Sequence, residues 1–260
     1  MDTPESAVVP LDTPGLLRSL YRDVLAPSFP PAELVDERTF LAGHDAGRLR
    51  SLGVVRDGRV VAGVVGQWFP DARVLLVQYL AIAPGARGCG IGSRLVTAAV
   101  ASWRALEPLL VVAEVEHPDH HTGSEAHGDP VARLRFYARL GARVLALPYF
   151  QPGGGPGGER VPALLLMSLP LDAATAATGA SGASRRWGGS GDVPASPVRT
   201  FLEANLRSSE GVLAHDAATR RLLDAARGDR VALVDPADPD ALATVPTGLL
   251  APHETHAPRP

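Results

Sequence analysis

The sequence predicts an α+β fold built on one mixed β-sheet. Apolar, β-branched runs separated by turn residues indicate strands, and helical apolar patterns lie between the later ones. The Asp57-Gly58 pair marks a hairpin within the early strands. Consecutive early strands favour antiparallel pairing, whereas strands joined through helices favour parallel pairing. We therefore expect a central mixed sheet of about seven strands with helices on its faces.

The first elements are a short edge strand and two helices. We expect the strand over 7–11, and a helix that Thr13 caps and Pro14 begins. A second helix is expected over 31–42 and should end before Gly43. Three strands separated by short turns follow, over 50–56, 60–69 and 74–83.

The later elements alternate between helix and strand. In chain order we expect a helix from Ile91 to Trp103, a strand over 109–116, a helix over 129–140 and strands over 143–147 and 161–169. A glycine-rich loop over 151–159 separates the last two strands. This order places the two later helices as crossovers of the sheet.

Beyond Pro170 the composition changes. Residues 172–197 are mainly Ala, Gly, Ser and Thr, which have little to bury, and we predict a flexible linker there. Residues 198–260 form a C-terminal extension of low complexity, partly helical and partly disordered, with helices expected over 198–206 and 217–226 and a strand over 231–234. The expected catalytic domain is therefore 1–171.

Composition excludes several classes of protein. The chain has 260 residues, a net charge of −3 and no basic excess, so we expect no nucleic-acid partner. No apolar run approaches the ~20 residues of a membrane span, and the N-terminus lacks a secretory pattern. A single cysteine excludes internal disulfides and a cysteine-built zinc site. We expect a cytoplasmic protein that does not bind membranes, and the sequence leaves a homodimer open.

The segment Arg87-Gly88-Cys89-Gly90-Ile91-Gly92 lies between a strand and a helix and predicts an anion site. Glycines let the backbone approach a ligand closely, and a helix start offers unpaired N–H groups. The segment is not a dinucleotide fingerprint, because Ser93 stands where the third glycine is needed. It is not a Walker loop, because the chain contains no lysine.

This R-x-x-G-x-G segment resembles the acyl-CoA loop of the Gcn5-related N-acetyltransferase (GNAT) family. A second segment, 135–142, is similar to the family's F/L-Y-x-x-L-G-F motif, and the resemblance extends over about 7–171. It implies the GNAT fold and acetyl-CoA as co-substrate. It also implies that the backbone of Leu80, Ala81 and Ile82 pairs with the pantetheine arm. The loop amides of the following residues would hold the pyrophosphate: Arg87, Gly88, Cys89, Gly90, Ile91, Gly92 and Ser93.

The resemblance implies a catalytic acid, and the sequence offers three candidate bases. Tyr137 matches the family's tyrosine that protonates the leaving thiolate; its alternative role is core packing. Glu114 and Glu116 alternate along one strand and share a face, where each could act as base, bind a cationic substrate or simply be solvated. Gln78 lies where some members carry a glutamate and cannot serve as a base, so His117 also remains a candidate.

The loop after the Glu116 strand is rich in His and acidic residues. We interpret it as a substrate-side loop rather than a metal site, because its spacing does not match a zinc motif. The acceptor pocket is expected to include His117, Tyr149 and Gln151.

The chain departs from the family at Pro130, where many family members have an asparagine that contacts the coenzyme. We do not carry that contact over to this chain. Cys89 is interpreted as a small filler.

These observations predict an acyltransferase. The expected reaction transfers the acetyl group of acetyl-CoA to a primary amine of a small molecule or peptide, by direct attack in a ternary complex and without a metal. The alternative is a non-catalytic acyl-CoA-binding module with a regulatory or interaction role. Replacing Tyr137 and Glu116 would separate the two, because an enzyme loses rate more than coenzyme affinity.

Overall fold

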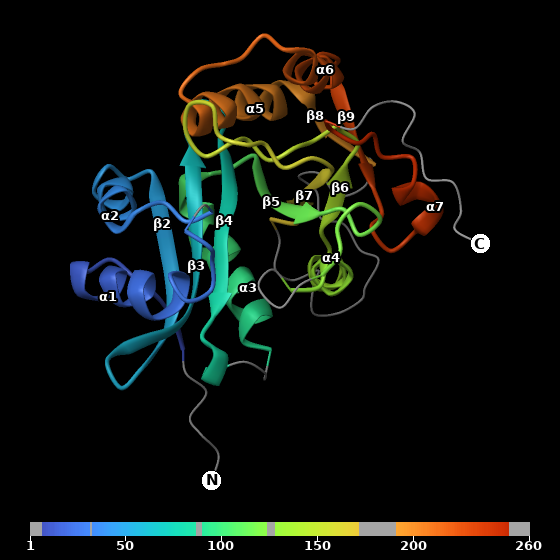
Figure 1. Ribbon diagram of the computed structural model, residues 1–260. Coiled ribbons are helices and arrows are strands. Elements are labelled where there is room, and N and C mark those ends of the chain that lie inside the picture. Colours follow the sequence, from blue (N-terminus) through green and yellow to red (C-terminus); the bar gives the residue numbers. More distant parts are fainter. Residues whose placement is uncertain (1–6, 32, 87–89, 124–127, 172–190, 250–260) are drawn as a thin grey trace.

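A computed structural model of the protein describes residues 7–31, 33–86, 90–123, 128–171 and 191–249 (Figure 1). Within these residues one mixed sheet has the strand order β1-β2-β3-β4-β5-β7-β6-β9-β8. The strands are β1 Val8–Pro10, β2 Leu49–Arg56, β3 Arg59–Phe69, β4 Val74–Ile82, β5 Leu110–Glu116, β6 Arg143–Leu145, β7 Leu164–Leu169, β8 Asp192–Pro194 and β9 Arg230–Val234. The α+β prediction with a mixed sheet is confirmed.

Helices cover both faces of this sheet. They are α1 Pro14–Ser19, α2 Glu37–Asp45, α3 Ile91–Trp103, α4 Pro130–Arg139, α5 Ala195–Glu210, α6 Ala217–Ala225 and α7 Pro239–Leu242. One apolar core lies between the sheet and α3, α4 and α7. On the opposite face, α1 and α2 cover the early strands and α5 and α6 cover the later ones, so this face has two separate cores.

Local sequence signals account for most of these elements. Thr13 caps α1 by accepting the Leu16 N–H, and α1 continues into a π-helical segment, Leu20–Leu25. The β2–β3 hairpin turns at Asp57 and Gly58, whose φ angles are 49° and 76°. Two positive φ angles in succession are the geometry that an Asp-Gly hairpin provides.

The second helix differs from the prediction. It begins at Glu37 rather than near residue 31, because the Asp36 carboxylate caps it by accepting the Thr39 N–H at 3.0 Å. Gly43 is buried inside this helix, not beyond its end. The helix is instead followed by Gly47, whose φ of 67° allows the chain to turn into β2.

The strand count also differs, and the cause lies in the extension. The sheet has nine strands rather than about seven, because β9 pairs with β6 through Val144 and Val234, and β8 pairs with β9. Residues 191–197, which the sequence assigns to the linker, form β8 and the first turn of α5. The rest of the predicted linker, 172–190, lies outside the described residues.

The extension packs on both faces of the later strands. In Figure 1, α5 and α6 lie across the upper end of the sheet, and α7 lies at the right-hand edge of the molecule. Phe201 of α5 meets Phe69 of β3 edge to face, with ring centroids 5.1 Å apart. Leu242 of α7 joins the core on the α4 side. No helix in the described part of the chain is long and apolar enough to span a bilayer.

The parallel pair β4–β5 forms a fork. The two strands pair only from Val74 to Val77 and from Leu110 to Ala113, although β4 runs on to Ile82 and β5 to Glu116. A bulge in β4 coincides with this opening: Val77 pairs with Gly66 of β3 and Tyr79 with Val65, which leaves Gln78 as the extra residue. Beyond these pairs the two strands separate.

Candidate active site

The open side of β4 is the predicted pantetheine edge. Leu80, Ala81 and Ile82 pair with β3 on one side, and within the described residues they have no strand partner on the side of β5. Backbone N–H and C=O groups on such an edge are ready to pair with an extended ligand. The fork therefore provides the kind of edge that the family resemblance implies.

The glycine-rich turn follows this edge. Arg87, Gly88 and Cys89 lie outside the described residues, but Gly90 is the N-cap of α3 with a φ of 69°, and no side chain caps the helix. No described residue lies within 4 Å of the position that a Cβ would take at Gly90, its chain neighbours aside. Ile91 is buried in the core and Ser93 is partly buried.

The neighbouring Gly92 packs close to α4, where a Cβ would lie 3.4 Å from the Phe136 ring. An uncapped helix N-terminus behind residues without side chains is suited to an anionic group such as a pyrophosphate. The residues described here therefore fit coenzyme A.

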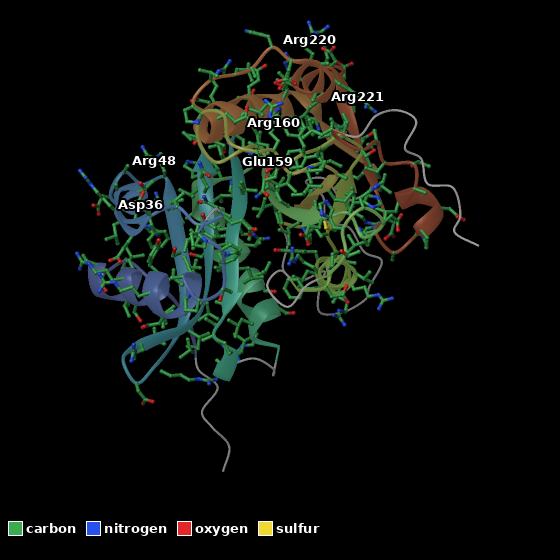
Figure 2. All side chains as sticks on the ribbon, viewed as in Figure 1. Asp36, Arg48, Glu159, Arg160, Arg220 and Arg221 are labelled. Carbon is green, nitrogen blue, oxygen red and sulfur yellow. The ribbon has the colours of Figure 1, made fainter. Side chains whose placement is uncertain are left out.

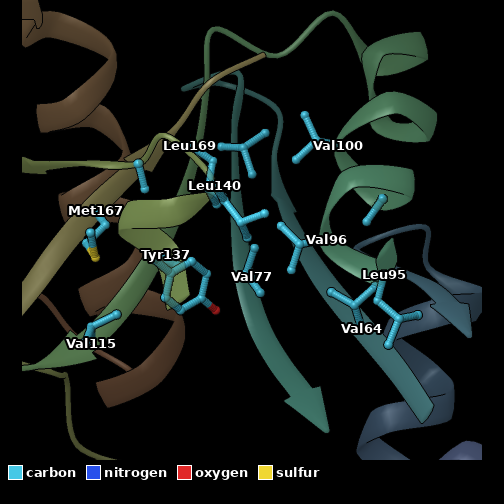
Figure 3. Packing of buried hydrophobic residues seen from close by; sticks show 14 of the residues in the cluster. Val64, Val77, Leu95, Val96, Val100, Val115, Tyr137, Leu140, Met167 and Leu169 are labelled. Carbon is cyan, nitrogen blue, oxygen red and sulfur yellow. The ribbon is translucent and has the colours of Figure 1, made fainter. Parts of the chain in front are cut away.

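Tyr137 lies on the α4 side of the fork. Its ring packs in the same core as Val77, the last β4 residue paired with β5, and Val115 of β5 (Figure 3). Burial raises the pKa of the Tyr137 phenol to about 12, and the Arg133 charge opposes this rise. The phenol therefore keeps its proton at neutral pH and can act as a donor.

Glu114 lies on the opposite side of the sheet, directly after the last β5 residue that pairs with β4. The Tyr149 hydroxyl donates a short hydrogen bond to its Oε1, and the Gln151 amide donates to its Oε2 at 3.4 Å. Burial raises the pKa of the Glu114 carboxyl, and the two donors partly offset this rise. The structure thus brings together three predicted site residues, Glu114, Tyr149 and Gln151.

Glu116 and His117 do not join this group. Glu116 forms an ion pair with Arg133 of α4, with 3.1 Å between oxygen and nitrogen. His117 is buried, with 3% of its surface exposed. Its Nδ1 accepts the Asp119 N–H at 3.2 Å. Burial and the neighbouring His120 lower the pKa of His117.

Two residues at this site were not predicted. The Asn205 amide of α5 donates to the Tyr149 hydroxyl at 3.2 Å, and Asn205 is almost fully buried. Tyr79 faces the site from β4, where its hydroxyl donates to the Glu33 carbonyl at 3.2 Å. The signal for Asn205 was present, because it occupies an apolar position of an amphipathic helix between Leu202 and Leu206.

Gln78 is the third unusual feature at the fork. Among the described residues, its Oε1 is a buried side-chain oxygen without a hydrogen-bond partner. The neighbouring Tyr79 hydroxyl is already engaged, because it accepts the Val35 N–H at 3.3 Å and donates to the Glu33 carbonyl. Gln78 Oε1 is thus an unused acceptor at the opening of the fork.

Within the described residues no group of three His, Cys, Asp or Glu side chains could hold a metal ion. Glu125 and His127 of the predicted substrate-side loop lie outside the described residues.

A cavity of about 430 Å³ lies beside β1, apart from the fork, and is lined in part by His44, Ser51 and Trp103. None of the predicted site residues lines it.

Comparison with protein-family models finds a match for the middle of the chain. Residues 48–141 match the family model described as acetyltransferase (GNAT) domain. This match includes the fork, the glycine-rich turn and Tyr137, and ends before Tyr149 and Asn205. No curated protein matches the chain.

Solved structures that resemble the chain are also acetyltransferases by name. The ribosomal-protein-S18-alanine N-acetyltransferase from Escherichia coli is 19% identical over 64% of this chain and 94% of its own, with a TM-score of 0.45. The IAA acetyltransferase from Bacillus cereus is 15% identical over 64% of this chain and 99% of its own, with a TM-score of 0.43.

Proposed function

We propose that this chain, which carries an acetyltransferase domain of the GNAT family, transfers the acetyl group of acetyl-CoA to a primary amine of a small molecule or peptide. A domain of this family supports acyltransferase activity in general; the donor, the acceptor class and the residue roles are our proposal. One observation carries it: the β4–β5 fork has a phenol on one face and a carboxylate on the other.

We assign coenzyme binding to two neighbouring segments of the chain. The open edge of Leu80, Ala81 and Ile82 would pair with the pantetheine arm, and the start of α3 at Gly90 would hold the pyrophosphate. When bound, acetyl-CoA supplies an activated acetyl group as a thioester. The fork would bring that group between the two faces of the sheet.

Glu114 is the better of the two carboxylate candidates for the base. An amine is mostly protonated at neutral pH and must lose a proton before it can attack. The raised pKa of Glu114 brings its carboxylate closer to the useful range, and it lies at the fork itself. Glu116 is already paired with Arg133, so we assign it a structural role.

Tyr137 is assigned as the acid. The departing sulfur needs a proton, and the Tyr137 phenol holds one with a pKa raised to about 12. The attacking nitrogen loses two protons in all: the first goes to the Glu114 carboxylate before attack, and the second, released as the amide forms, replaces the proton that the Tyr137 phenol gives to the sulfur. Glu114 then returns its proton to solvent. Both steps occur in one ternary complex, with no acyl group carried on the protein.

The experiment that tests this function is release of free thiol from acetyl-CoA in the presence of a panel of primary amines. Amine-dependent release by the native chain, lost in Glu114→Gln, supports the proposal. Calorimetric titration of acetyl-CoA into native protein and Gly90→Glu separates binding from turnover, because the substitution puts a negative charge at the pyrophosphate site. Binding without release for any amine would favour the non-catalytic acyl-CoA-binding module instead.

A further inference from the structure

Helix α5 belongs to the C-terminal extension, yet it reaches the candidate site. Asn205 lies on its buried face, in a row with Phe201, Leu202 and Leu206 that packs on the later strands. A buried amide is costly unless it is hydrogen-bonded, so an asparagine at this position needs a compensating partner. Its side chain finds that partner in the Tyr149 hydroxyl, 3.2 Å away.

The hydrogen bonds run in one direction towards Glu114. The Asn205 amide donates to the Tyr149 oxygen, and the Tyr149 proton goes to Glu114 Oε1. A hydroxyl that accepts one hydrogen bond becomes a stronger donor of the next. Because Asn205 donates to the phenol oxygen, the phenol proton remains directed at the carboxylate.

A second set of contacts fixes the loop that carries Tyr149 and Gln151. Arg160, labelled in Figure 2, lies at the end of this loop. It forms a two-pronged ion pair with Glu210 of α5, with both N–O distances at 2.7 Å. Glu210 also accepts the Gly153 N–H at 3.3 Å. A bidentate pair restricts orientation as well as distance, so α5 holds the loop over the Glu114 face of the sheet.

We propose that Asn205 is a positioning residue of the acceptor site: it holds Tyr149, which orients the Glu114 carboxylate, so that the C-terminal extension supplies part of the catalytic machinery. This inference rests on the proposed function, in which Glu114 is the base. The titratable groups that face Glu114 among the described residues are the phenols of Tyr149 and Tyr79. The asparagine therefore acts on Glu114 through Tyr149.

The isosteric variant Asn205→Asp tests this arrangement. Its carboxylate would accept the Tyr149 proton, which takes a donor away from Glu114 and adds a like charge nearby, and both changes raise the pKa of Glu114. Asn205→Ala removes only the donor to Tyr149 and should raise that pKa less. Glu203→Gln on the exposed side of the same helix is the matched control and should leave it unchanged.

The measurement is a pH titration of ¹³C-labelled glutamate side chains by NMR, with the Glu114 signal identified by its loss in Glu114→Gln. It reports on Glu114 whether or not the protein turns over an amine. An unshifted Glu114 titration in both Asn205 variants, with the fold intact by circular dichroism, overturns the inference. The double variant Asn205→Ala with Tyr149→Phe should titrate as Tyr149→Phe alone, because the effect passes through the hydroxyl.

Activity is the separate readout. With an amine that the native protein acetylates, Asn205→Asp should lower kcat/KM at neutral pH by roughly tenfold and move the acidic limb of the pH profile upwards. The KM for acetyl-CoA should not change. Absence of thiol release from the native chain would refute the proposed function and leave the titration result to decide the role of Asn205.

Discussion

The two faces of the β4–β5 fork are built in different ways. The Tyr137 face is an apolar core built mainly by β4, α3, β5 and α4, which follow one another along the chain, and completed by other strands of the sheet and by Leu242 of α7. The Glu114 face surrounds a polar group with an apolar core. The hydrogen bonds of this group come from β5, the loop after β6 and helix α5, so its members are up to 91 positions apart in sequence, from Glu114 to Asn205.

The two faces also differ in which of their residues match the family model. The face made from consecutive elements contains the features that match the GNAT family model, which ends at residue 141. The face made from distant elements carries the candidate base and the proposed acceptor side, and its Tyr149, Gln151 and Asn205 lie outside that match. A proposed coenzyme side inside the match and a proposed acceptor side outside it are what we expect where function depends on a site rather than on a fold.

The largest effect should come from removing the base on the polar face. Glu114→Gln keeps the size of the side chain and abolishes its ability to take a proton, so kcat/KM should fall about 10³-fold. Affinity for acetyl-CoA, measured by calorimetry, should stay the same, because the coenzyme residues lie on β4 and α3. Weakened coenzyme binding would indicate that the two faces are not separable.

The same variant makes a second prediction, about stability. The pKa of Glu114 is raised in the folded protein, so its contribution to stability is present at low pH and is lost as pH rises through the folded pKa. Glu114→Gln should therefore gain stability relative to the native protein as pH increases from acid to neutral. Thermal unfolding at a series of pH values measures this gain, and an opposite trend would show that the carboxylate is stabilised by its donors.

The next largest effect concerns the packing of the extension. Phe201→Ala removes a buried ring that meets Phe69 and should lower the free energy of unfolding by about 3–5 kcal/mol. Val212→Ala, on an exposed side chain after the same helix, should change it by less than about 0.5 kcal/mol. Urea denaturation provides both values. A small loss for Phe201→Ala would mean that α5 is only loosely attached.

Tyr137→Phe tests the apolar face. It retains the ring in the core and removes the proton donor, so we expect kcat to fall about 10²-fold with little loss of stability. The basic limb of the native pH profile should lie high, because the Tyr137 pKa is raised to about 12. An unchanged kcat would assign Tyr137 to packing, the alternative that the sequence left open.

The smallest effect is expected at the second carboxylate. Glu116→Gln breaks a partly exposed ion pair with Arg133, which should cost less than about 1 kcal/mol of stability. The rate should change by less than about threefold, since Glu116 is not hydrogen-bonded to Tyr149 or Gln151. A rate loss comparable to that of Glu114→Gln would mean that both carboxylates take part in the reaction.

The sequence predicted the face made of consecutive elements well. The hairpin at Asp57-Gly58, the helix after the glycine-rich turn and the helix expected over 129–140 follow from local signals, and each is found close to where it was expected. The start of α2 was missed, because a side-chain cap at Asp36 competes with the earlier turn signals and the helix pattern alone does not decide between them.

The polar face was only partly predictable. Glu114, Tyr149 and Gln151 were named as site residues, but their hydrogen bonds join residues 35 and 37 positions apart in sequence, which no local pattern predicts. Asn205 was missed because its partner lies 56 residues away in sequence. The two additional strands were missed as sheet members for the same reason, since edge pairing between β6 and β9 leaves no local pattern.

The position of α5 in the chain has a consequence for biosynthesis. A ribosome adds about 5–20 residues per second, so Asn205 is made several seconds after the last residue of α4. During that interval the nascent chain can form the segments proposed to hold the coenzyme, while Tyr149 still lacks its hydrogen-bond partner on α5. Premature termination in this interval would release a chain with the proposed coenzyme segments but without the residue proposed to complete the acceptor side.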